Sequence, residues 1–376
     1  MCVNAAASHL LGRADFLAIA SAASVAPALS SQTLAVPPGL SPGNERAAGI
    51  AAASPFVRST FAATEALARS IGNAALRESV VGLLTDPRPS YADKYASAPA
   101  RIGLRDELAR AGFVKPDARI EGIFPAGSEN GSRAPQPFWA TPGSGDDSHH
   151  AYPGGLTVHE YFNASAAVGF ATTYDRVYFN DRRTIDRDVV VAAALYHDVM
   201  KSAVFQWKAD GTLFAEDQIA GTGAHHVLSG AEAIVRGRSA RFVITLLSAH
   251  AAPSLGDEAK VTDWCRAAAL VAGVDAVAFG LVRKSLDGYA LAPLFVPAEA
   301  FISNLSDHDY VLSIHAARAV LPELRRVSTR YGRYPSFAWF KNDVLAHLSA
   351  IGLYQTLASA GSDAFDRRVD ALVASR

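Results

Sequence analysis

Residues 184–201 form the stretch that most constrains the fold, because the eight residues 189–196 within it are all apolar or aromatic. Thr184 or Asp186 can cap a helix at its start, and Asp186 and Asp188 place negative charge where the helix dipole favours it. A helix that is apolar on every side is buried inside a larger protein. We therefore expect the rest of the chain to pack around this helix.

The predicted core helix ends in two polar side chains, His197 and Asp198. Burying a carboxylate is costly unless a cation compensates its charge, and a metal ion does so most simply. Lys201 follows His197 by four residues, so its ammonium shares the helix face with the imidazole. The pattern indicates a metal site with a neighbouring cation, which suits an anionic substrate.

Other histidines accompany this pair: seven of the eleven in the chain lie between residues 149 and 250. Several of these, and one aspartate, begin, end or interrupt helical stretches and are candidate metal ligands: His159, His226, His250 and Asp275. Between the adjacent His225 and His226, the interpretation favours His226 as the ligand. Nitrogen and oxygen ligands without thiolate suit Fe, Mn, Zn, Co or Ni, with Mg as a further possibility.

Composition narrows the class of protein. The net charge of −1 gives no electrostatic basis for binding nucleic acid or an anionic membrane surface. The two cysteines exclude a disulfide framework and a thiolate-rich metal site. Half of the residues are hydrophobic (50%), enough for a large core.

The fold class that the sequence predicts is all-α. Helical periodicity covers residues 55–84 and 102–111, and the chain reads as helical almost throughout after residue 149: 156–175, 184–201, 224–236, 240–251, 258–280, 306–331, 337–358 and 362–374. Between them, residues 113–148 are rich in Pro, Gly and Ser, with one short strand expected at 119–124, and form either a lid over a site or a surface excursion.

Residues 1–40 resemble a twin-arginine export signal, although Ala14 stands where the second arginine belongs. The alternative is a disordered or loosely helical arm. Export predicts a periplasmic or secreted protein, and the alternative location is the cytoplasm. The apolar run is too short and too weakly hydrophobic for a membrane span.

The order His, His-Asp, His, His, Asp resembles that of the HD-domain superfamily of metal-dependent phosphohydrolases, over residues 149–280. Residues 149–156 followed by His159 look like the entry to the metal helix in HD exoribonucleases. Residues 197–201 are similar to the family's His-Asp-x-x-Lys, with Met200 where a glycine often precedes the lysine. The resemblance implies a helical metal-binding core at 149–285 and leaves both ends of the chain unassigned. There the sequence pattern predicts an export signal or disordered arm at 1–40, N-terminal helices and a long loop packing on the core at 41–148, and a helical extension at 286–376.

The resemblance also implies a role for each candidate residue. One metal would be bound by His159, His197, Asp198 and Asp275, and a second by His226 and His250, with Asp198 bridging the two. Contacts to the substrate would come from His149, His150, His225 and Lys201. Residues 307–309, Asp-His-Asp, could approach the pocket from the C-terminal helices.

These assignments predict an enzyme that hydrolyses a phosphate ester or a related small anionic substrate at a dinuclear centre. Lys201 would stabilise charge on the phosphoryl group, and Asp198 would hold the metal spacing. One alternative is a diiron HD oxygenase that cleaves a C–C or C–P bond with O₂. Another is an HD module that binds a ligand without turnover. The oligomeric state is left open.

Overall fold

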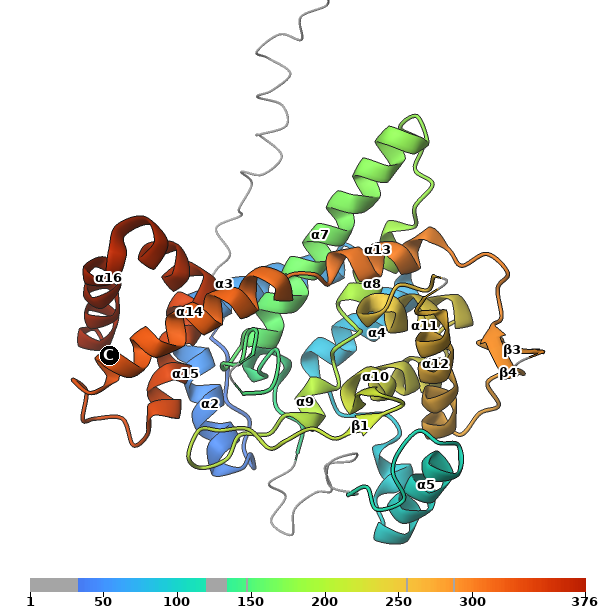
Figure 1. Ribbon diagram of the computed structural model, residues 1–376, viewed down its shortest axis with the longest axis horizontal. Helices are drawn as coiled ribbons and strands as arrows, with labels where there is room; N and C mark the ends of the chain where they lie inside the picture. The colour runs from blue at the N-terminus through green and yellow to red at the C-terminus, as the bar shows by residue number, and fades with distance from the viewer. Residues whose placement is uncertain (1–32, 120–133, 147, 255, 287) are drawn as a thin grey trace, which may run out of the picture.

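The computed structural model describes residues 33–119, 134–146, 148–254, 256–286 and 288–376. The described chain is mostly helical, which confirms the all-α prediction (Figure 1). The export signal predicted within residues 1–40 falls largely outside the described residues, as does nearly all of the strand expected at 119–124. Among the residues that are described, no helix combines the length and apolar character needed to cross a membrane.

The N-terminal part contains α2 (Pro42–Ala53), α3 (Pro55–Arg69), α4 (Ala74–Thr85) and α5 (Ala98–Arg110), with short 3₁₀ turns at Ala92–Tyr95 and Phe138–Ala140. The middle part contains α7 (Gly155–Tyr178), α8 (Arg187–Ala194), α9 (Lys201–Val204), α10 (Ala224–Val235), α11 (Ala240–Leu247), a 3₁₀ turn at Ser248–His250, and α12 (Glu258–Ala272). The C-terminal part contains α13 (Ala298–Ser306), α14 (Tyr310–Ser328), α15 (Phe337–Leu348) and α16 (Ala350–Ala374).

Two small antiparallel hairpins, which the sequence analysis did not predict, join these helices. The first pairs β1 (Gln218–Ile219) with β2 (Thr222–Gly223), and the second pairs β3 (Val282–Ser285) with β4 (Gly288–Leu291). The first hairpin leads directly into α10, so it sets where that helix begins.

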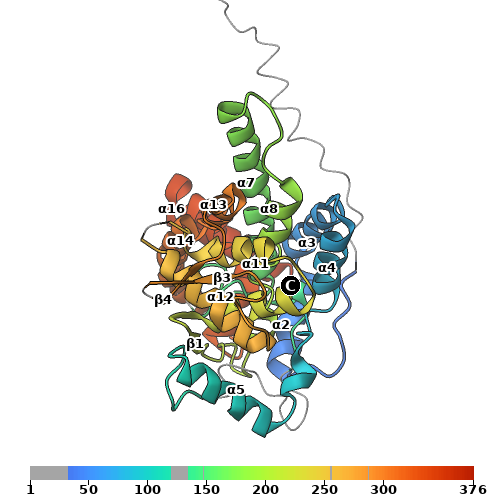
Figure 2. The same ribbon diagram turned by 90° about the vertical axis from the view of Figure 1, so that its right-hand side faces the viewer.

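The helix α8 lies in the middle of the molecule and packs against α3, α4, α7, α11 and α13. The C-terminal helices α14–α16 lie at one end and α10–α12 toward the other (Figure 1). The perpendicular view shows α3 and α4 side by side along one flank of the molecule (Figure 2). A large apolar core surrounds α8, with Val191, Leu195 and Tyr196 among its buried side chains. A second core fills the space between α14, α15 and α16, with Phe340 and Phe365 among its members.

Several predicted helices are shorter than expected because local caps interrupt them. The stretch 55–84 divides at Asn73, whose side chain accepts from the N–H of Leu76 and begins α4. In the stretch 184–201, Asp186 caps α8 as predicted, but the regular helix ends at Ala194 and turns follow. The helix expected at 306–331 is interrupted at 307–309, which separate α13 from α14. The helix expected at 337–358 is interrupted at Ser349, which separates α15 from α16.

Two further corrections concern residues 37–44 and the long helix expected at 258–280. The Pro and Gly content of residues 37–44 predicts a linker, yet α2 begins at Pro42 with the Ser41 side chain as its cap. The helix α12 ends at Ala272, because Gly273 adopts the left-handed conformation (φ 77°) that terminates a helix. Asp275 therefore lies in a turn after the helix and not inside it.

Candidate metal centre

The turns after α8 direct His197 and Asp198 into the interior. The backbone N–H of His197 still donates to the carbonyl of Ala193 at 3.0 Å, so the pair extends the buried helix by a turn. His197 Nδ1 donates to the carbonyl oxygen of Ala194 at 2.8 Å, and Glu160 Oε2 lies 3.3 Å from the same nitrogen. With Nδ1 held in this way, the ring presents Nε2 to its neighbours.

Asp198 lies between two groups of imidazoles, and each of its oxygens faces one group. Its Oδ2 lies 3.3 Å from His159 Nε2 and 3.4 Å from His197 Nε2. Its Oδ1 faces three further Nε2 atoms, at 3.1 Å for His225, 3.3 Å for His250 and 3.8 Å for His226. One buried carboxylate thus joins five imidazoles from four separate segments.

A second aspartate, Asp307, completes the first group. Its Oδ1 lies 3.0 Å from His159 Nε2 and 3.3 Å from His197 Nε2, and its Oδ2 lies 3.1 Å from His250 Nδ1. It stands at the corner between α13 and α14 and is buried. We call the seven residues the histidine–aspartate cluster: an inner half of His159, His197 and Asp307, an outer half of His225, His226 and His250, and Asp198 shared by both.

The structure does not bring Asp275 into this cluster, which corrects the prediction that it is a ligand. Asp275 is exposed, and its Oδ1 accepts from the N–H of Ala278 at 2.7 Å within the turn after α12. The prediction failed because it assumed that the apolar run around Asp275 was one uninterrupted core helix. The signal for Asp307 was the polar stretch 306–309 between two amphipathic helices.

Each imidazole of the outer half has a fixed orientation. His225 Nδ1 lies 2.5 Å from Glu216 Oε1, whose side chain also accepts from the backbone N–H of His225. His226 Nδ1 pairs with the hydroxyl of Thr222 in the hairpin that precedes α10. The rings of His226 and His250 stack, with centroids 3.4 Å apart. The structure therefore places both adjacent histidines in the cluster, where the sequence analysis favoured His226 as the ligand.

The other residues expected to contact the substrate occupy different positions around the cluster. Lys201 is buried, with its Nζ against Asp198 Oδ2 and 2.5 Å from the carbonyl oxygen of Gly143. His149 lies at the rim, its ring 5.2 Å from that of His159. His150 lies behind the inner half, where its Nε2 is 2.5 Å from Asp309 Oδ2.

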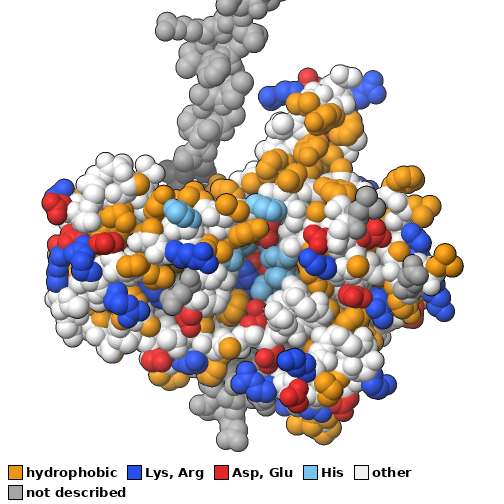
Figure 3. All heavy atoms as spheres, viewed as in Figure 1, with side chains coloured by type: hydrophobic (Ala, Val, Ile, Leu, Met, Phe, Trp, Pro, Cys, Tyr) orange, Lys and Arg blue, Asp and Glu red, His pale blue; other side chains and the backbone are white. Residues whose placement is uncertain are grey.

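A hollow of about 400 Å³ opens onto the outer half. Its lining includes all three outer histidines together with Lys201, His149, Asp307, Phe205, Glu216 and Tyr310. The space-filling view shows histidine side chains gathered in a depression near the middle of this face, with acidic side chains beside them (Figure 3). His159 and His197 do not line the hollow and lie beneath it, whereas Asp307 of the inner half reaches its wall.

Charge within the cluster keeps its carboxylates ionised. Burial raises the pKa of Asp198, but the neighbouring His197 and Lys201 lower it by more than that, so the pKa ends well below its usual range. The pKa of Asp307 also ends well below its usual range, because His250 and His197 outweigh the effect of burial.

The histidines divide into two groups by their pKa. Burial lowers the pKa of His226 and of His250, which favours the neutral form that can bind a metal. For His159, burial also lowers the pKa, but hydrogen bonds to Asp198 and Asp307 raise it overall to about 10. A metal at the inner half would therefore have to displace a proton from His159.

The donor set fits a divalent transition metal. His197 Nε2 and His225 Nε2 are buried yet form no hydrogen bond with any residue that the structure describes. Buried polar atoms are normally paired, so each of these nitrogens calls for a partner. Asp198, His225, His226 and His250 bring four donors close enough together to bind one ion, and His159, His197 and Asp198 bring three. Asp307 Oδ1 lies 3.0 Å and 3.3 Å from Nε2 of His159 and His197.

Comparison with known proteins gives one partial match. Over 64 residues the chain is 38% identical to dihydroneopterin 2',3'-cyclic phosphate phosphodiesterase of Methanocaldococcus jannaschii. The match covers 17% of this chain and 24% of that protein, so the chain spans about a quarter of the length of the curated relative it matches. No protein-family model matches the chain, and no solved structure matches it.

Proposed function

We propose that this chain is a metal-dependent phosphohydrolase of the HD-domain superfamily, with two divalent ions held by the histidine–aspartate cluster. The observation that carries the proposal is the position of Asp198, whose two oxygens face separate groups of imidazole nitrogens at 3.1–3.8 Å. A carboxylate shared in this way suits two ions held side by side. The partial match to a phosphodiesterase supports hydrolysis over the oxygenase alternative.

The inner ion would be held by His159, His197, Asp307 and Asp198, and the outer ion by His225, His226, His250 and Asp198. When bound, two such ions supply Lewis-acid polarisation of a phosphoryl oxygen and a water of lowered pKa. Nitrogen and oxygen donors suit Mn, Fe, Co, Ni or Zn.

Two further residues act on the substrate side. Lys201, whose ammonium lies against Asp198, places a fixed positive charge beside the bridging carboxylate and stabilises negative charge that develops on the phosphoryl group. Burial lowers the pKa of His149 to about 2, with His159 and His150 adding to the effect. His149 therefore meets the substrate as a neutral imidazole that can donate or accept a hydrogen bond.

The hollow indicates a small substrate. Its volume of about 400 Å³ lies in the range that small organic ligands occupy. Phe205 and Tyr310 give it an aromatic lining next to the histidines, which suits a phosphate ester with a compact, partly apolar organic group. Cyclic phosphodiesters are the first class to test, because the curated relative is named for one.

The proposal is tested by measuring metal content and turnover of the purified full chain. We expect about two equivalents of divalent transition metal per chain by elemental analysis, and release of product from a 2',3'-cyclic phosphodiester or a phosphomonoester. O₂ consumption without phosphate-ester cleavage would instead support the diiron oxygenase. Metal uptake with neither reaction, or no metal uptake at all, would support a module that binds a ligand without turnover. Absence of metal uptake would refute both the hydrolase and the oxygenase.

A further inference from the structure

Behind the inner half of the cluster lies a buried chain of three side chains. His150 Nε2 lies 2.5 Å from Asp309 Oδ2, and His150 Nδ1 lies 3.1 Å from the hydroxyl of Tyr152. Asp309 Oδ2 in turn lies 3.9 Å from His159 Nδ1, on the side of the ring that faces away from Asp198. These three side chains thus connect the back of His159, a proposed metal ligand, to the C-terminal helices.

The back of the His159 ring needs an acceptor. Its Nε2 faces Asp198 and Asp307, whereas its Nδ1 is buried and forms no hydrogen bond within the described part of the chain. A neutral imidazole that offers Nε2 to a metal carries its proton on Nδ1, and the group that accepts this proton sets the orientation of the ring. Asp309 is the carboxylate nearest to that nitrogen among the ion pairs of His159.

The direction of the hydrogen bonds is consistent with this role. An ionised Asp309 only accepts, so His150 Nε2–H must donate to it, which leaves His150 Nδ1 to accept from the Tyr152 hydroxyl. Asp309 remains an acceptor and can receive a second N–H, from His159. The tautomer of His150 is therefore set by its bonds to Tyr152 and Asp309. Asp309 is then left to set the tautomer of His159.

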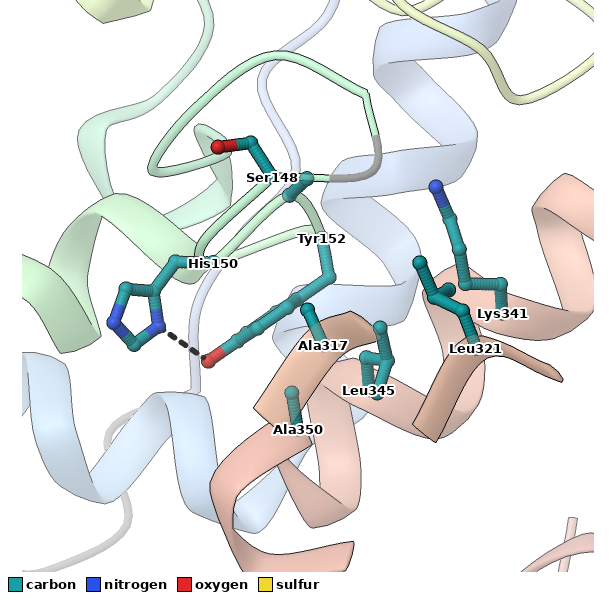
Figure 4. A pocket seen from close by; sticks show the side chains of 9 residues that line it. Ser148, His150, Tyr152, Ala317, Leu321, Lys341, Leu345 and Ala350 are labelled. Atoms are coloured by element: carbon teal, nitrogen blue, oxygen red, sulfur yellow. Dashed lines mark hydrogen bonds between the residues drawn. The ribbon is translucent and has the colours of Figure 1, made fainter. Parts of the chain in front are cut away.

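The packing of Tyr152 and the backbone of His150 hold these three side chains in place. Tyr152 packs its ring into the core of α14–α16, and its hydroxyl points to His150 (Figure 4). The backbone of His150 has a positive φ of 51°, and a Cβ added at Gly155 would lie 1.9 Å from the His150 carbonyl oxygen. This loop conformation therefore depends on a close approach that only glycine permits.

We propose that Asp309, itself held by His150 and Tyr152, is a positioning residue that fixes the orientation and tautomer of His159 so that the inner half of the cluster can bind a metal. The inference rests on the proposed function, because it takes His159 as a metal ligand. It assigns the start of α14 a part in the metal centre beyond Asp307 itself. Asp309 acts through His159 and contacts neither metal nor substrate.

The test compares Asp309→Asn with a matched control, Asp343→Asn. Asp343 is also a buried aspartate beside a histidine, with Oδ1 3.5 Å from His347 Nδ1, but it lies between the C-terminal helices. Metal uptake by the full chain is followed as a two-step titration with Co²⁺ against a competing chelator. We expect Asp309→Asn to weaken the inner step by about 10- to 100-fold and to leave the outer step unchanged. Asp343→Asn should leave both steps unchanged.

A second variant and a spectroscopic measurement guard against a purely structural effect. Tyr152→Phe, which removes only the hydroxyl at the far end of the chain, should weaken the inner step in the same direction but less. With Zn²⁺ bound and ¹⁵N-labelled histidine, NMR should show His159 protonated at Nδ1 in the native chain and a mixture of tautomers in Asp309→Asn.

The outcomes separate this inference from the proposed function. If the native chain takes up no metal, the proposed function fails. If the native chain takes up two equivalents and Asp309→Asn binds both with native affinity, only the positioning role of Asp309 is overturned. A third equivalent that disappears in Asp309→Asn would also overturn it, since Asp309 would then be a ligand.

Discussion

The inner and outer halves of the histidine–aspartate cluster share Asp198 but differ in burial and in what surrounds them. His159 and His197 are each 1% exposed, whereas the side chain of His250 is 22% exposed and lines the hollow. The inner half is closed by the corner between α13 and α14, and the outer half opens toward solvent. On the proposed function, an ion at the inner half would therefore be retained, whereas an ion at the outer half would meet the substrate.

The strongest challenge to this comparison is Asp198→Ala, which removes the group that both halves share. We expect loss of both metal equivalents and a fall in turnover of more than about a thousandfold, since two ions together contribute several kcal/mol of transition-state stabilisation. Elemental analysis and a phosphodiester assay measure the two effects. Retention of one full equivalent would show that the halves are independent.

The inner half is tested by Asp307→Asn against Asp275→Asn. Replacing Asp307 removes a charged oxygen 3.0 Å from His159 Nε2, so the inner equivalent should bind about 100-fold or more weakly. Asp275 caps an exposed turn, and its replacement should change neither metal content nor activity. If the Asp275 variant loses metal and the Asp307 variant does not, the assignment of the two aspartates is reversed.

The outer half is tested by His226→Ala, with His315→Ala as control. His226 Nε2 faces Asp198 Oδ1, whereas His315 is exposed and contacts Tyr354. The His226 variant should lose one equivalent, retain the other against a chelator, and have little activity. Loss of both equivalents would contradict the idea that the inner ion is held independently.

The smallest effect is expected from Glu216→Gln, which alters the side chain that pairs with both Nδ1 and the backbone N–H of His225. A carboxylate that orients a metal-binding imidazole contributes about 10- to 100-fold to metal affinity. We therefore expect weaker binding at the outer half, a higher metal requirement for activity, and no change at the inner half. Chelator competition monitored by residual activity measures this shift, and equal weakening at both halves would speak against it.

Sequence reasoning identified site residues where residue type and local pattern coincide. It failed where the end of a helix decided the position of a residue. The pair at 197–198 was recognisable because an apolar helix cannot end in a buried carboxylate without compensation. Asp275 and Asp307 both follow apolar helices, and one-dimensional patterns do not separate them. The break at Gly273 leaves Asp275 in an exposed turn, whereas α13 packs on α7 and carries Asp307 inward.

The helical class, the buried helix at α8 and the metal-binding residue types at its end follow from the sequence, because periodicity and residue chemistry are local properties. Three features depend on packing: both adjacent histidines face the centre, Asp307 closes the inner half, and the start of α14 reaches the back of His159. The last two join residues separated by more than a hundred positions, as between His159 and Asp307. Their distances are set by how whole helices pack against one another, and no local pattern encodes that arrangement.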